Sequence, residues 1–234
     1  MFHYFNLIDR ALGSKNKLKR FNENETFSNV IQPTREEVTT NFPHKGNWNT
    51  FFKNDNPIVL ELGCGKGEYT IALAEKNPNI NYIGIDIKGA RFWRGAKTAL
   101  EEDLPNVAFI RTQIELVDFC FAESEVSEIW ITFPDPQIKY KRTKHRLTNE
   151  EFLLKYHKIL NDDGIMHLKT DSEFMHGYTL GLLHGQEQEV LYAHHDIYNN
   201  PHAPEVVLNT QTFYEKQYLE TDKAITYIKF KLKY

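Results

Sequence analysis

The sequence predicts a single α/β domain, with a mostly parallel sheet of seven strands, an antiparallel C-terminal strand and helices on both faces. From Pro57 onward, short apolar runs alternate with longer segments of helical period, which is typical of a parallel sheet covered by helices. The first run leads directly into a glycine-rich turn, as in Rossmann-like folds. The last segment, AITYIKFKLKY, alternates in polarity as a half-buried strand does. A chain of 234 residues is long enough to bury one such core.

Each strand is expected at an apolar run and each helix in the segment that follows it. The five parallel strands are expected at residues 58–62, 82–86, 107–111, 128–133 and 164–169. The helices are expected at residues 68–76, 90–102, 114–122, 149–160 and 172–183. Two further strands, at residues 189–197 and 224–232, form a hairpin-like pair that completes the sheet.

The N-terminal part of the chain differs in composition from the rest. Residues 1–55 are polar and aperiodic, so we expect a basic arm with little regular structure, followed by one folded domain at residues 56–234. Residues 10–20 contain five basic side chains and no acid, and so do residues 139–146. Because the whole chain has a net charge of −4, the remainder is strongly acidic. This balance excludes a protein that coats nucleic acid generally and favours a partner that docks at the two basic stretches.

Cysteine and histidine usage indicates the compartment and argues against a metal site. Cys64 and Cys120 lie far apart in the sequence, so we expect both to be reduced and buried. The start, MFHYFNLIDR, is not a signal peptide, and no 18 apolar residues run together, so we expect a cytoplasmic protein without membrane contact. His194, His195 and His202 match no metal-ligand spacing, and no metal is expected.

The glycine-rich turn, ELGCGKGE at residues 61–68, favours a particular cofactor. A dinucleotide-binding loop would need glycine in place of Glu68, and a pyrophosphate would be repelled by Glu61 and Glu68. S-adenosylmethionine (AdoMet) is cationic and carries no phosphate, so a carboxylate at the end of the strand can face its ammonium or sulfonium group. We therefore expect Glu61, Gly63 and Gly65 to bind AdoMet. The alternative is a glycine turn kept for packing alone.

Two polar residues at the ends of the next strands are candidates for the nucleoside part of the cofactor. Asp86 lies 19 residues beyond Gly67, near the spacing at which an acid accepts hydrogen bonds from ribose hydroxyls. Gln113 is placed to meet the adenine, because an amide can pair with the amino group and a ring nitrogen. The alternatives are a solvated strand-end acid and a surface residue that begins a helix.

The fourth strand ends in FPDP at residues 133–136, which places Asp135 at the carboxyl edge of the sheet, where α/β folds bind ligands. Two prolines fix the backbone around it. Five basic residues follow without an acid, as expected for a phosphate-binding loop rather than a solvated basic face: Lys139, Lys141, Arg142, Lys144 and Arg146.

These motifs together resemble the bacterial single-subunit tRNA (guanine-N7)-methyltransferases. The resemblance covers most of the chain from about Trp48 and rests on GNWNTFFKNDNPIVLELGCGKGEY, NYIGIDI, FPDPQIKYKRTKHRLT, LKTD at residues 168–171 and TFYE at residues 212–215. It implies a class I methyltransferase fold, AdoMet as methyl donor, and methylation of guanine 46 in the variable loop of tRNA.

The resemblance also implies roles for individual residues. Glu61, Asp86 and Asp135 match cofactor-contacting acids. The positions that match substrate contacts are Lys139, Asp171, Thr212, Phe213, Tyr214 and Glu215. In two places the chain departs from the family pattern, since Gln137 and Gln113 stand where the family usually has Trp and Asp.

The expected chemistry depends on placement more than on proton transfer. Guanine N7 has an in-plane lone pair and needs no strong general base, so alignment of the reactants is the main task. Asp135 is expected to stabilise the positive charge that moves onto the purine, and Asp171 to accept from the guanine N1–H and amino group. Structural alternatives are a helix-terminal acid at residue 171 and a surface turn at residues 212–215.

Two other functions remain open from the sequence. One is a non-catalytic tRNA- or RNA-binding module on the same fold, against which the intact glycine loop argues. The other is a methyltransferase for small molecules, which would not need the basic loop after Asp135. The protein is expected to be a monomer or a homodimer.

Overall fold

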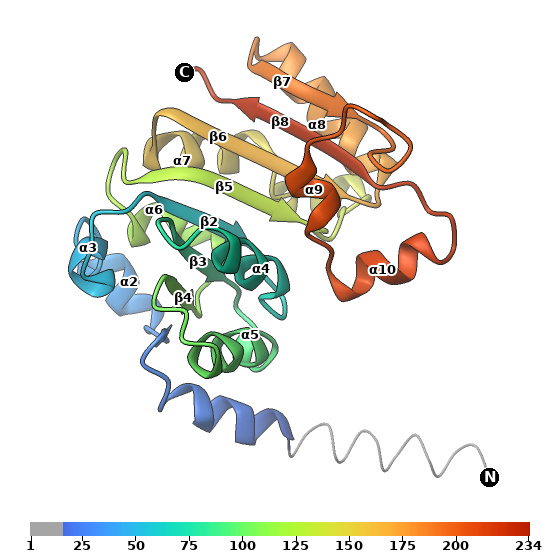
Figure 1. Cartoon of the computed structure of the whole chain (residues 1–234). Coiled ribbons are helices and arrows are strands. Elements are labelled where there is room, and N and C mark those ends of the chain that lie inside the picture. The colour runs from blue at the N-terminus through green and yellow to red at the C-terminus, as the bar shows by residue number, and fades with distance from the viewer. Residues whose placement is uncertain (1–15) are drawn as a thin grey trace.

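A computed structural model of the chain describes residues 16–234, which form one twisted sheet with helices on both faces (Figure 1). The strand order is β1-β4-β3-β2-β5-β6-β8-β7, and β8 is antiparallel to both of its neighbours. The sheet has eight strands where seven were expected, because Val30–Ile31 adds a short parallel strand beside β4. The strands are β1 (Val30–Ile31), β2 (Ile58–Leu62), β3 (Asn81–Ile85), β4 (Val107–Ile110), β5 (Val126–Thr132), β6 (Leu160–Thr170), β7 (Glu189–His194) and β8 (Thr226–Lys231).

The helices follow the expected order, and α4 has the expected bounds. They are α2 (Arg35–Asn41), α3 (Trp48–Phe52), α4 (Glu68–Lys76), α5 (Gly89–Glu101), η1 (Ile114–Leu116), α6 (Val117–Cys120), η2 (Tyr140–His145), α7 (Glu150–Ile159), α8 (Glu173–Gly185), α9 (Glu205–Asn209) and α10 (Phe213–Leu219). The helix expected at residues 114–122 is divided into η1 and α6. Two helices, α9 and α10, were not expected, because each is at most seven residues long and too short for a visible helical period.

Two hydrophobic clusters, one on each face of the sheet, form the core. Leu60 and Ile83 belong to the cluster beneath α2, α3, α7 and α8, whereas their neighbours Val59 and Tyr82 belong to the cluster beneath α4 and α5. This division follows from the alternation of side chains along a strand. Both faces of the central strands are therefore buried, as the continuous apolar runs in the sequence indicate.

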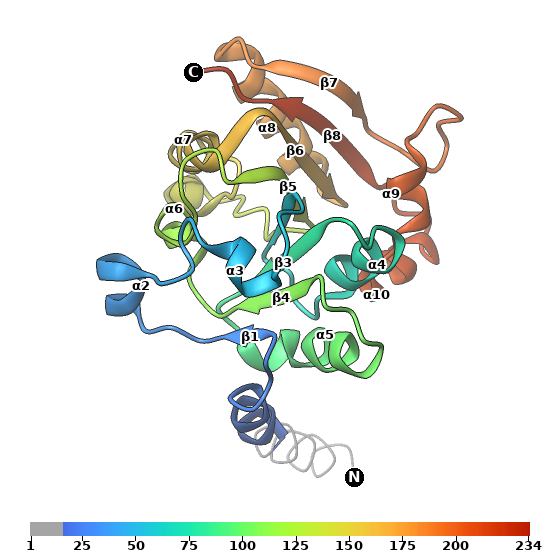
Figure 2. The same cartoon turned by 60° about the vertical axis from the view of Figure 1, so that its left-hand side comes forward.

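The expectation of little regular structure in residues 1–55 is wrong for the residues that the structure describes. Residues 16–24 are helical, and β1, α2 and α3 follow (Figure 2). Thr34 and Glu37 form a capping box at the start of α2, and Trp48 is completely buried against Phe121. Each element is short and is held by one or two large side chains, so its sequence shows no period. Arg10 and Lys15, part of the first basic stretch, lie outside the described residues.

The topology gathers the carboxyl ends of β2, β3, β4, β5 and β6 at one edge of the sheet, because these strands are parallel. The glycine turn and the FPDP segment both begin there. Cys64 and Cys120 are both buried thiols, as expected. Within residues 16–234, no helix has the length and apolarity to cross a membrane.

Candidate active site

The glycine turn between β2 and α4 depends on left-handed backbone at three positions. Gly63, Gly65 and Gly67 have φ values of +76°, +56° and +75°, a region that other residues adopt at a cost. A Cβ on Gly63 would point toward Ile114 and Leu147, at 3.9 Å from each, so the turn leaves open space on that side. A Cβ on Gly67 would lie only 2.7 Å from the ring of Phe109. The third glycine therefore serves packing, whereas the first two face outward.

Replacing Gly67 by Ala is expected to destabilise the fold by about 2–3 kcal/mol, because the strained φ and the contact with Phe109 both oppose a Cβ. Gly65→Ala is the matched control, since its φ is also positive but its Cβ would come no closer than 3.9 Å to another atom. It should cost only about 1 kcal/mol. Urea unfolding of both variants measures the difference, and equal losses would contradict this division of roles.

Glu61 lies buried under the glycine turn, and both of its carboxylate oxygens are occupied by protein groups. Thr70 donates to Oε2 through its backbone N–H, at 2.9 Å, and through its hydroxyl, and Thr132 donates to Oε1 at 2.7 Å. Burial raises the pKa of Glu61 to about 7, against the opposing effect of these hydrogen bonds. Through these hydrogen bonds Glu61 connects the glycine turn to α4 and β5. The sequence did not predict them.

The raised pKa of Glu61 predicts a pH-dependent stability. Between about pH 4.5 and 7 the folded chain binds more protons at this residue than the unfolded chain, so its free energy of unfolding falls as the pH rises through that window. Glu61→Gln lacks this titration. The free energy of unfolding of the variant relative to the natural protein should therefore rise by up to about 3 kcal/mol from pH 4.5 to above 7. Urea unfolding at several pH values checks this, and a constant difference would refute it.

A pocket of about 290 Å³ opens beside the glycine turn, at the ends of β3 and β4. Asp86, Gln113 and Gln137 line it together with Ile114 and Leu147. The Asp86 carboxylate accepts hydrogen bonds from the backbone N–H groups of Gly65, at 3.1 Å, and Lys88, at 2.7 Å. Each carboxylate oxygen keeps a lone pair for a further donor. Its position at the pocket wall therefore suits a ligand hydroxyl.

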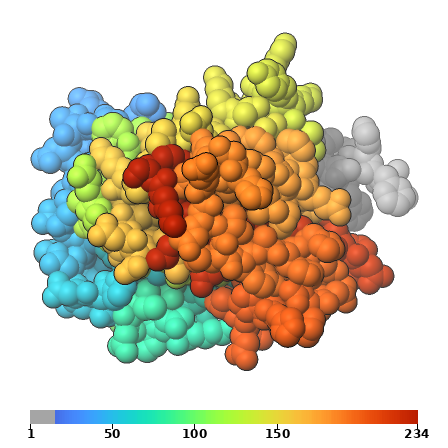
Figure 3. Space-filling view, turned by 90° about the horizontal axis from the view of Figure 1, so that it is seen from above, coloured from blue at the N-terminus to red at the C-terminus, as the bar shows by residue number. Residues whose placement is uncertain are grey.

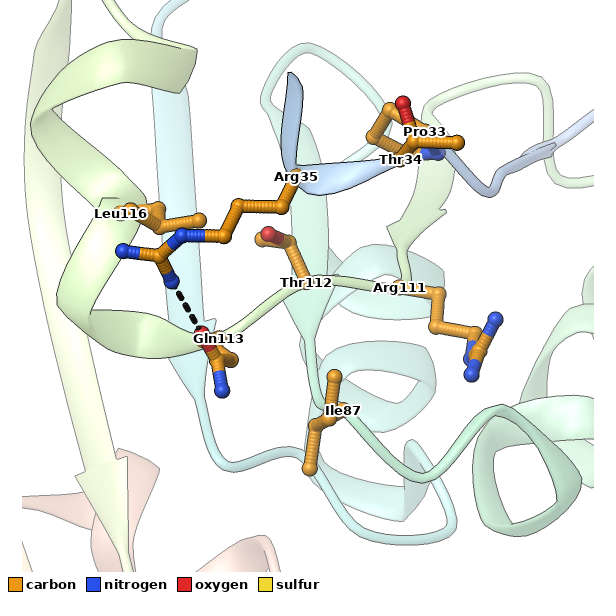
Figure 4. Close-up of a pocket in the computed structure, with 8 residues that line it drawn as sticks. All are labelled: Pro33, Thr34, Arg35, Ile87, Arg111, Thr112, Gln113 and Leu116. Atoms are coloured by element: carbon orange, nitrogen blue, oxygen red, sulfur yellow. Dashed lines mark hydrogen bonds between the residues drawn. The ribbon is translucent and has the colours of Figure 1, made fainter. Parts of the chain in front are cut away.

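Gln113 stands between this pocket and a neighbouring one of about 340 Å³. Figure 4 shows that Arg35, from the first turn of α2, reaches across the second pocket to Gln113. Its Nη1 donates to Gln113 Oε1 at 2.6 Å. The bond fixes the amide and leaves its NH₂ group as a donor. Arg35 was missed in the sequence analysis because it lies in the segment expected to be unstructured.

Asp135 lies exposed at the carboxyl edge, on a strained loop. Phe133 and Gln137, two residues before and after it, both have a φ of +47°, which is uncommon outside glycine and gathers at functional sites. The backbone N–H of Gln137 donates to Asp135 Oδ1 at 3.1 Å. Since Gln137 also lines the 290 Å³ pocket, this hydrogen bond connects Asp135 to the wall of that pocket.

The basic loop at residues 139–146 contains one buried basic side chain, which supports the loop, and four exposed ones. Arg146 is buried, and it donates to the carbonyl oxygens of Gln137 and Ile138, both at 3.2 Å, and stacks on Tyr178. The expectation that all five basic residues bind phosphate is therefore wrong for Arg146, whose guanidinium holds the loop in place. Tyr140 is 90% exposed, and the yellow-green segment around it projects from the surface in Figure 3. Four basic side chains of the loop are accessible to solvent: Lys139, Lys141, Arg142 and Lys144.

Asp171 lies at the end of β6, on the same edge of the sheet. Its carboxylate forms an ion pair with Lys223, which also lies over the ring of Tyr218. Asp171 is therefore not free in this conformation, and a substrate donor would share it with Lys223. No sequence pattern predicts this partner, which follows 52 residues later.

Residues 212–215 begin α10, and some of their side chains are exposed whereas others face the interior. Thr212 is the N-cap and forms a capping box with Glu215. Phe213 and Tyr214 are about half exposed and lie over the glycine turn, since Lys66 Nζ is 4.2 Å from the Phe213 ring and Glu68 accepts from the Phe213 N–H at 2.9 Å. These aromatic side chains therefore border the site, whereas the capping residues shape the helix.

Glu215 faces the interior and is completely buried. It accepts from Tyr198 at 2.7 Å and pairs at 2.6 Å with Lys169, which is also completely buried on β6. Lys169 further donates to the carbonyl oxygens of Val207 and Thr210, at 2.6 and 2.9 Å. Burial lowers the pKa of Lys169 to about 8, against the opposing effect of Glu215. This network, which no sequence motif indicates, connects residues 205–219 to the sheet.

The edge of the sheet thus brings most of the expected residues together. Asp86, Gln113 and the glycine turn border one pocket, Asp135 lies beside it, and Phe213 with Tyr214 cover the turn. Among residues 16–234, no cluster of three His, Cys, Asp or Glu side chains has the arrangement of a metal site.

Comparison with known proteins gives the family. Residues 55–228 match a family model described as a putative methyltransferase. Over 95% of its length, the chain is 74% identical to the tRNA (guanine-N(7)-)-methyltransferase of Christiangramia forsetii and covers all of that protein. The chain belongs to the tRNA (guanine-N7)-methyltransferase family. Relatives of the same name are 50% identical in Porphyromonas gingivalis, over 89% of this chain and 86% of that one, and 34% identical in Listeria monocytogenes, over 74% and 79%.

Solved structures confirm the fold expected from the sequence. The 16S rRNA methyltransferase KamB superposes with a TM-score of 0.60 at 13% identity, covering 79% of this chain and 92% of that one. A 30S ribosomal A1408 methyltransferase from an uncultured bacterium gives 0.58 at 14% identity, over 80% and 93%. The sheet with its single antiparallel strand is therefore that of a class I methyltransferase.

AdoMet is the methyl donor of this family, and the residues at the edge of the sheet fit it. The outward-facing glycines leave space toward Ile114 and Leu147, as a bound nucleoside requires. Asp86 offers free lone pairs at the pocket wall. The two glutamines that depart from the family pattern each have an arginine partner, Arg35 for Gln113 and Arg142 for Gln137, the latter at 2.9 Å. Gln137 thus fixes the basic loop and provides no aromatic contact.

Proposed function

We propose that the protein transfers the methyl group of AdoMet to N7 of guanine 46 in the variable loop of tRNA. The observation that carries this proposal is the position of Asp135 on a strained loop, where it is hydrogen-bonded to Gln137 at the wall of the 290 Å³ pocket and precedes the exposed basic residues in the chain. The names of the close relatives support the tRNA substrate and the N7 position.

The chain's own residues divide the work of binding the donor. Asp86 accepts from the ribose hydroxyls, and the Gln113 amide, fixed by Arg35, donates to the adenine. Gly63 and Gly65 let the backbone approach the methionine part closely. Glu61 supports the turn from below through its hydrogen bonds with Thr70 and Thr132. When bound, AdoMet supplies an electrophilic methyl group on a sulfonium.

Asp135 orients the guanine and stabilises the positive charge that arises on it. N7 has a free lone pair, so no residue needs to remove a proton before methyl transfer. The Gln137 N–H already fixes the Asp135 carboxylate before the reaction. Little free energy is therefore needed to reorient this group as positive charge develops on the guanine. Alignment of N7 with the methyl carbon supplies the larger part of the rate, on the order of 7–11 kcal/mol.

The substrate side of the site is formed by the basic loop, Asp171 and the start of α10. Lys139 binds tRNA phosphate, and Asp171 accepts from the guanine N1–H and amino group while it remains paired with Lys223. Phe213 and Tyr214 stack on the flipped base. Thr212 and Glu215 place these two rings by capping α10. Because tRNA is the substrate, we place the protein in the cytoplasm.

Equilibrium titration with AdoMet, followed by transfer of labelled methyl groups to unmodified tRNA, tests the proposal. Binding of AdoMet together with labelled tRNA is the expected result. Failure to bind AdoMet would favour a non-catalytic RNA-binding module. Binding of AdoMet without any transfer to tRNA would favour a methyltransferase for small molecules.

Neutralising the exposed lysines of the basic loop should weaken the salt dependence of tRNA binding. The triple variant Lys139→Gln, Lys141→Gln, Lys144→Gln keeps the two supporting arginines. The slope of log affinity against log salt should fall by about 0.7–0.9 for each phosphate contact removed. Binding titrations at several salt concentrations measure it, and an unchanged slope would mean that the loop is only solvated.

A further inference from the structure

A second basic surface lies on α5, outside the residues assigned to the site above. Lys88, Arg91, Arg94 and Lys97 follow one another at intervals of three residues, and we call them the α5 ridge. No acidic residue occurs between Ile87 and Leu100. The ridge starts two residues after Asp86, so its N-terminal end lies at the wall of the cofactor pocket.

The helix at residues 16–24 adds positive charge beside this ridge. Arg20 lies over the ring of Trp93 at 4.8 Å, and Lys97 lies 5.3 Å from the same ring. Asn24 donates to the carbonyl oxygen of Gly89 at 2.9 Å. Figures 1 and 2 both show the two helices next to each other. Two basic segments about 70 residues apart in sequence therefore form one surface.

The other end of the surface reaches the aromatic residues of α10. Lys66 and Arg94 line the same hollow between α4 and α5, together with Glu68 and Glu75, and Lys66 lies 4.0 Å from the Glu68 carboxylate. Lys66 in turn lies against the rings of Phe213, at 4.2 Å, and Tyr214, at 5.7 Å. The hollow therefore connects the α5 ridge to the place where the substrate base is bound in the proposed function, and it contains charges of both signs.

The exposed cations of the ridge are available for an anion. Among residues 16–234, neither Lys88 nor Arg91 nor Arg94 has an ion-pair partner, and all three are exposed. Unpaired positive side chains that are exposed on one surface repel a cationic partner and attract a polyanion. Arginine in particular binds phosphate through two parallel hydrogen bonds.

The α5 ridge and the basic loop lie on opposite faces of the sheet, and both reach the edge where the parallel strands end. Phe92 of α5 packs in one core cluster, and Phe152 of α7, which follows the basic loop, packs in the other. We propose that the α5 ridge, with the helix at residues 16–24, binds the tRNA phosphate backbone on the side of the pocket opposite the basic loop. The tRNA then crosses the edge of the sheet between two positive surfaces, which fixes its orientation. This inference rests on the proposed function for the identity of the RNA.

The double variant Arg91→Gln, Arg94→Gln tests it, with Lys158→Gln, Lys233→Gln as the matched control. Lys158 and Lys233 are exposed and lie at the opposite edge of the sheet, just before β6 and just after the antiparallel β8. For the ridge variant, the salt slope of tRNA binding should fall by about 1.4–1.8, with a raised KM for tRNA and AdoMet affinity within about twofold of the natural protein. The control should leave the slope unchanged.

Each outcome bears on the inference. An unchanged slope and KM in the ridge variant, or an equal change in the control, would overturn it. Thermal unfolding of both variants should match that of the natural protein, because all four side chains are on the surface. Methyl transfer by the natural protein is measured in the same assay, so an absence of transfer would count against the proposed function while the binding slopes still test the ridge.

Discussion

Replacing Asp135 by Ala is expected to lower the rate of methyl transfer to tRNA by at least about a hundredfold. Removal of one preorganised group that stabilises transition-state charge has an effect of this size in other enzymes. Asp135 is exposed and its only hydrogen bond within residues 16–234 comes from the Gln137 N–H, so the loss of stability should be about 1 kcal/mol. Single-turnover kinetics with labelled AdoMet measures the rate.

Binding measurements separate a catalytic effect from a structural one. The affinity of Asp135→Ala for tRNA should remain within a few-fold of the natural protein, because the basic loop is held by Arg146 and Gln137 and does not depend on the carboxylate. Retained methyl transfer would refute the role of Asp135. A parallel loss of tRNA binding would instead assign it to the docking of the substrate.

Replacing Lys169 by Met is expected to destabilise the fold by about 3–5 kcal/mol. The change leaves the Glu215 carboxylate buried without its cation, and removal of one partner from a buried ion pair has a cost of this order. The carbonyl oxygens of Val207 and Thr210 also lose their donor. Urea unfolding measures the change, and α9 and α10 should lose protection from hydrogen exchange first.

The double variant Lys169→Met, Glu215→Gln provides the control. With both charges removed, no unpaired ion remains inside, so the double variant should be more stable than Lys169→Met alone. Its methyl transfer should also recover in part, because Phe213 and Tyr214 return toward the glycine turn. A loss below about 1 kcal/mol for the single variant would show that the pair does not hold this segment.

The central sheet could be predicted from the sequence because its strands are buried on both faces and read as continuous apolar runs. Bounds such as those of α4 follow from a glycine before the helix and a regular period within it. The short elements of residues 16–55 could not be predicted in this way. These elements are stabilised by individual interactions, such as the burial of Trp48 in the core and the capping box at Thr34, and by contacts with strands distant in the sequence.

Motifs could place the candidate residues together at the carboxyl edge of the sheet but could not distinguish outer from inner side chains. Phe213 and Glu215 belong to one short motif, yet Phe213 is half exposed and Glu215 is completely buried. The reason is the helical turn of α10, which sends side chains two positions apart to different sides. Arg146 is a similar case, because its burial depends on aromatic side chains from α8.

The most direct test of the proposed activity is nucleoside analysis of tRNA methylated by the natural protein. Two unmodified transcripts, one with guanine at position 46 and one with adenine there, are incubated with labelled AdoMet and digested. Labelled 7-methylguanosine is expected from the first transcript and none from the second. Label in a different nucleoside, or equal amounts of 7-methylguanosine from both transcripts, would contradict it.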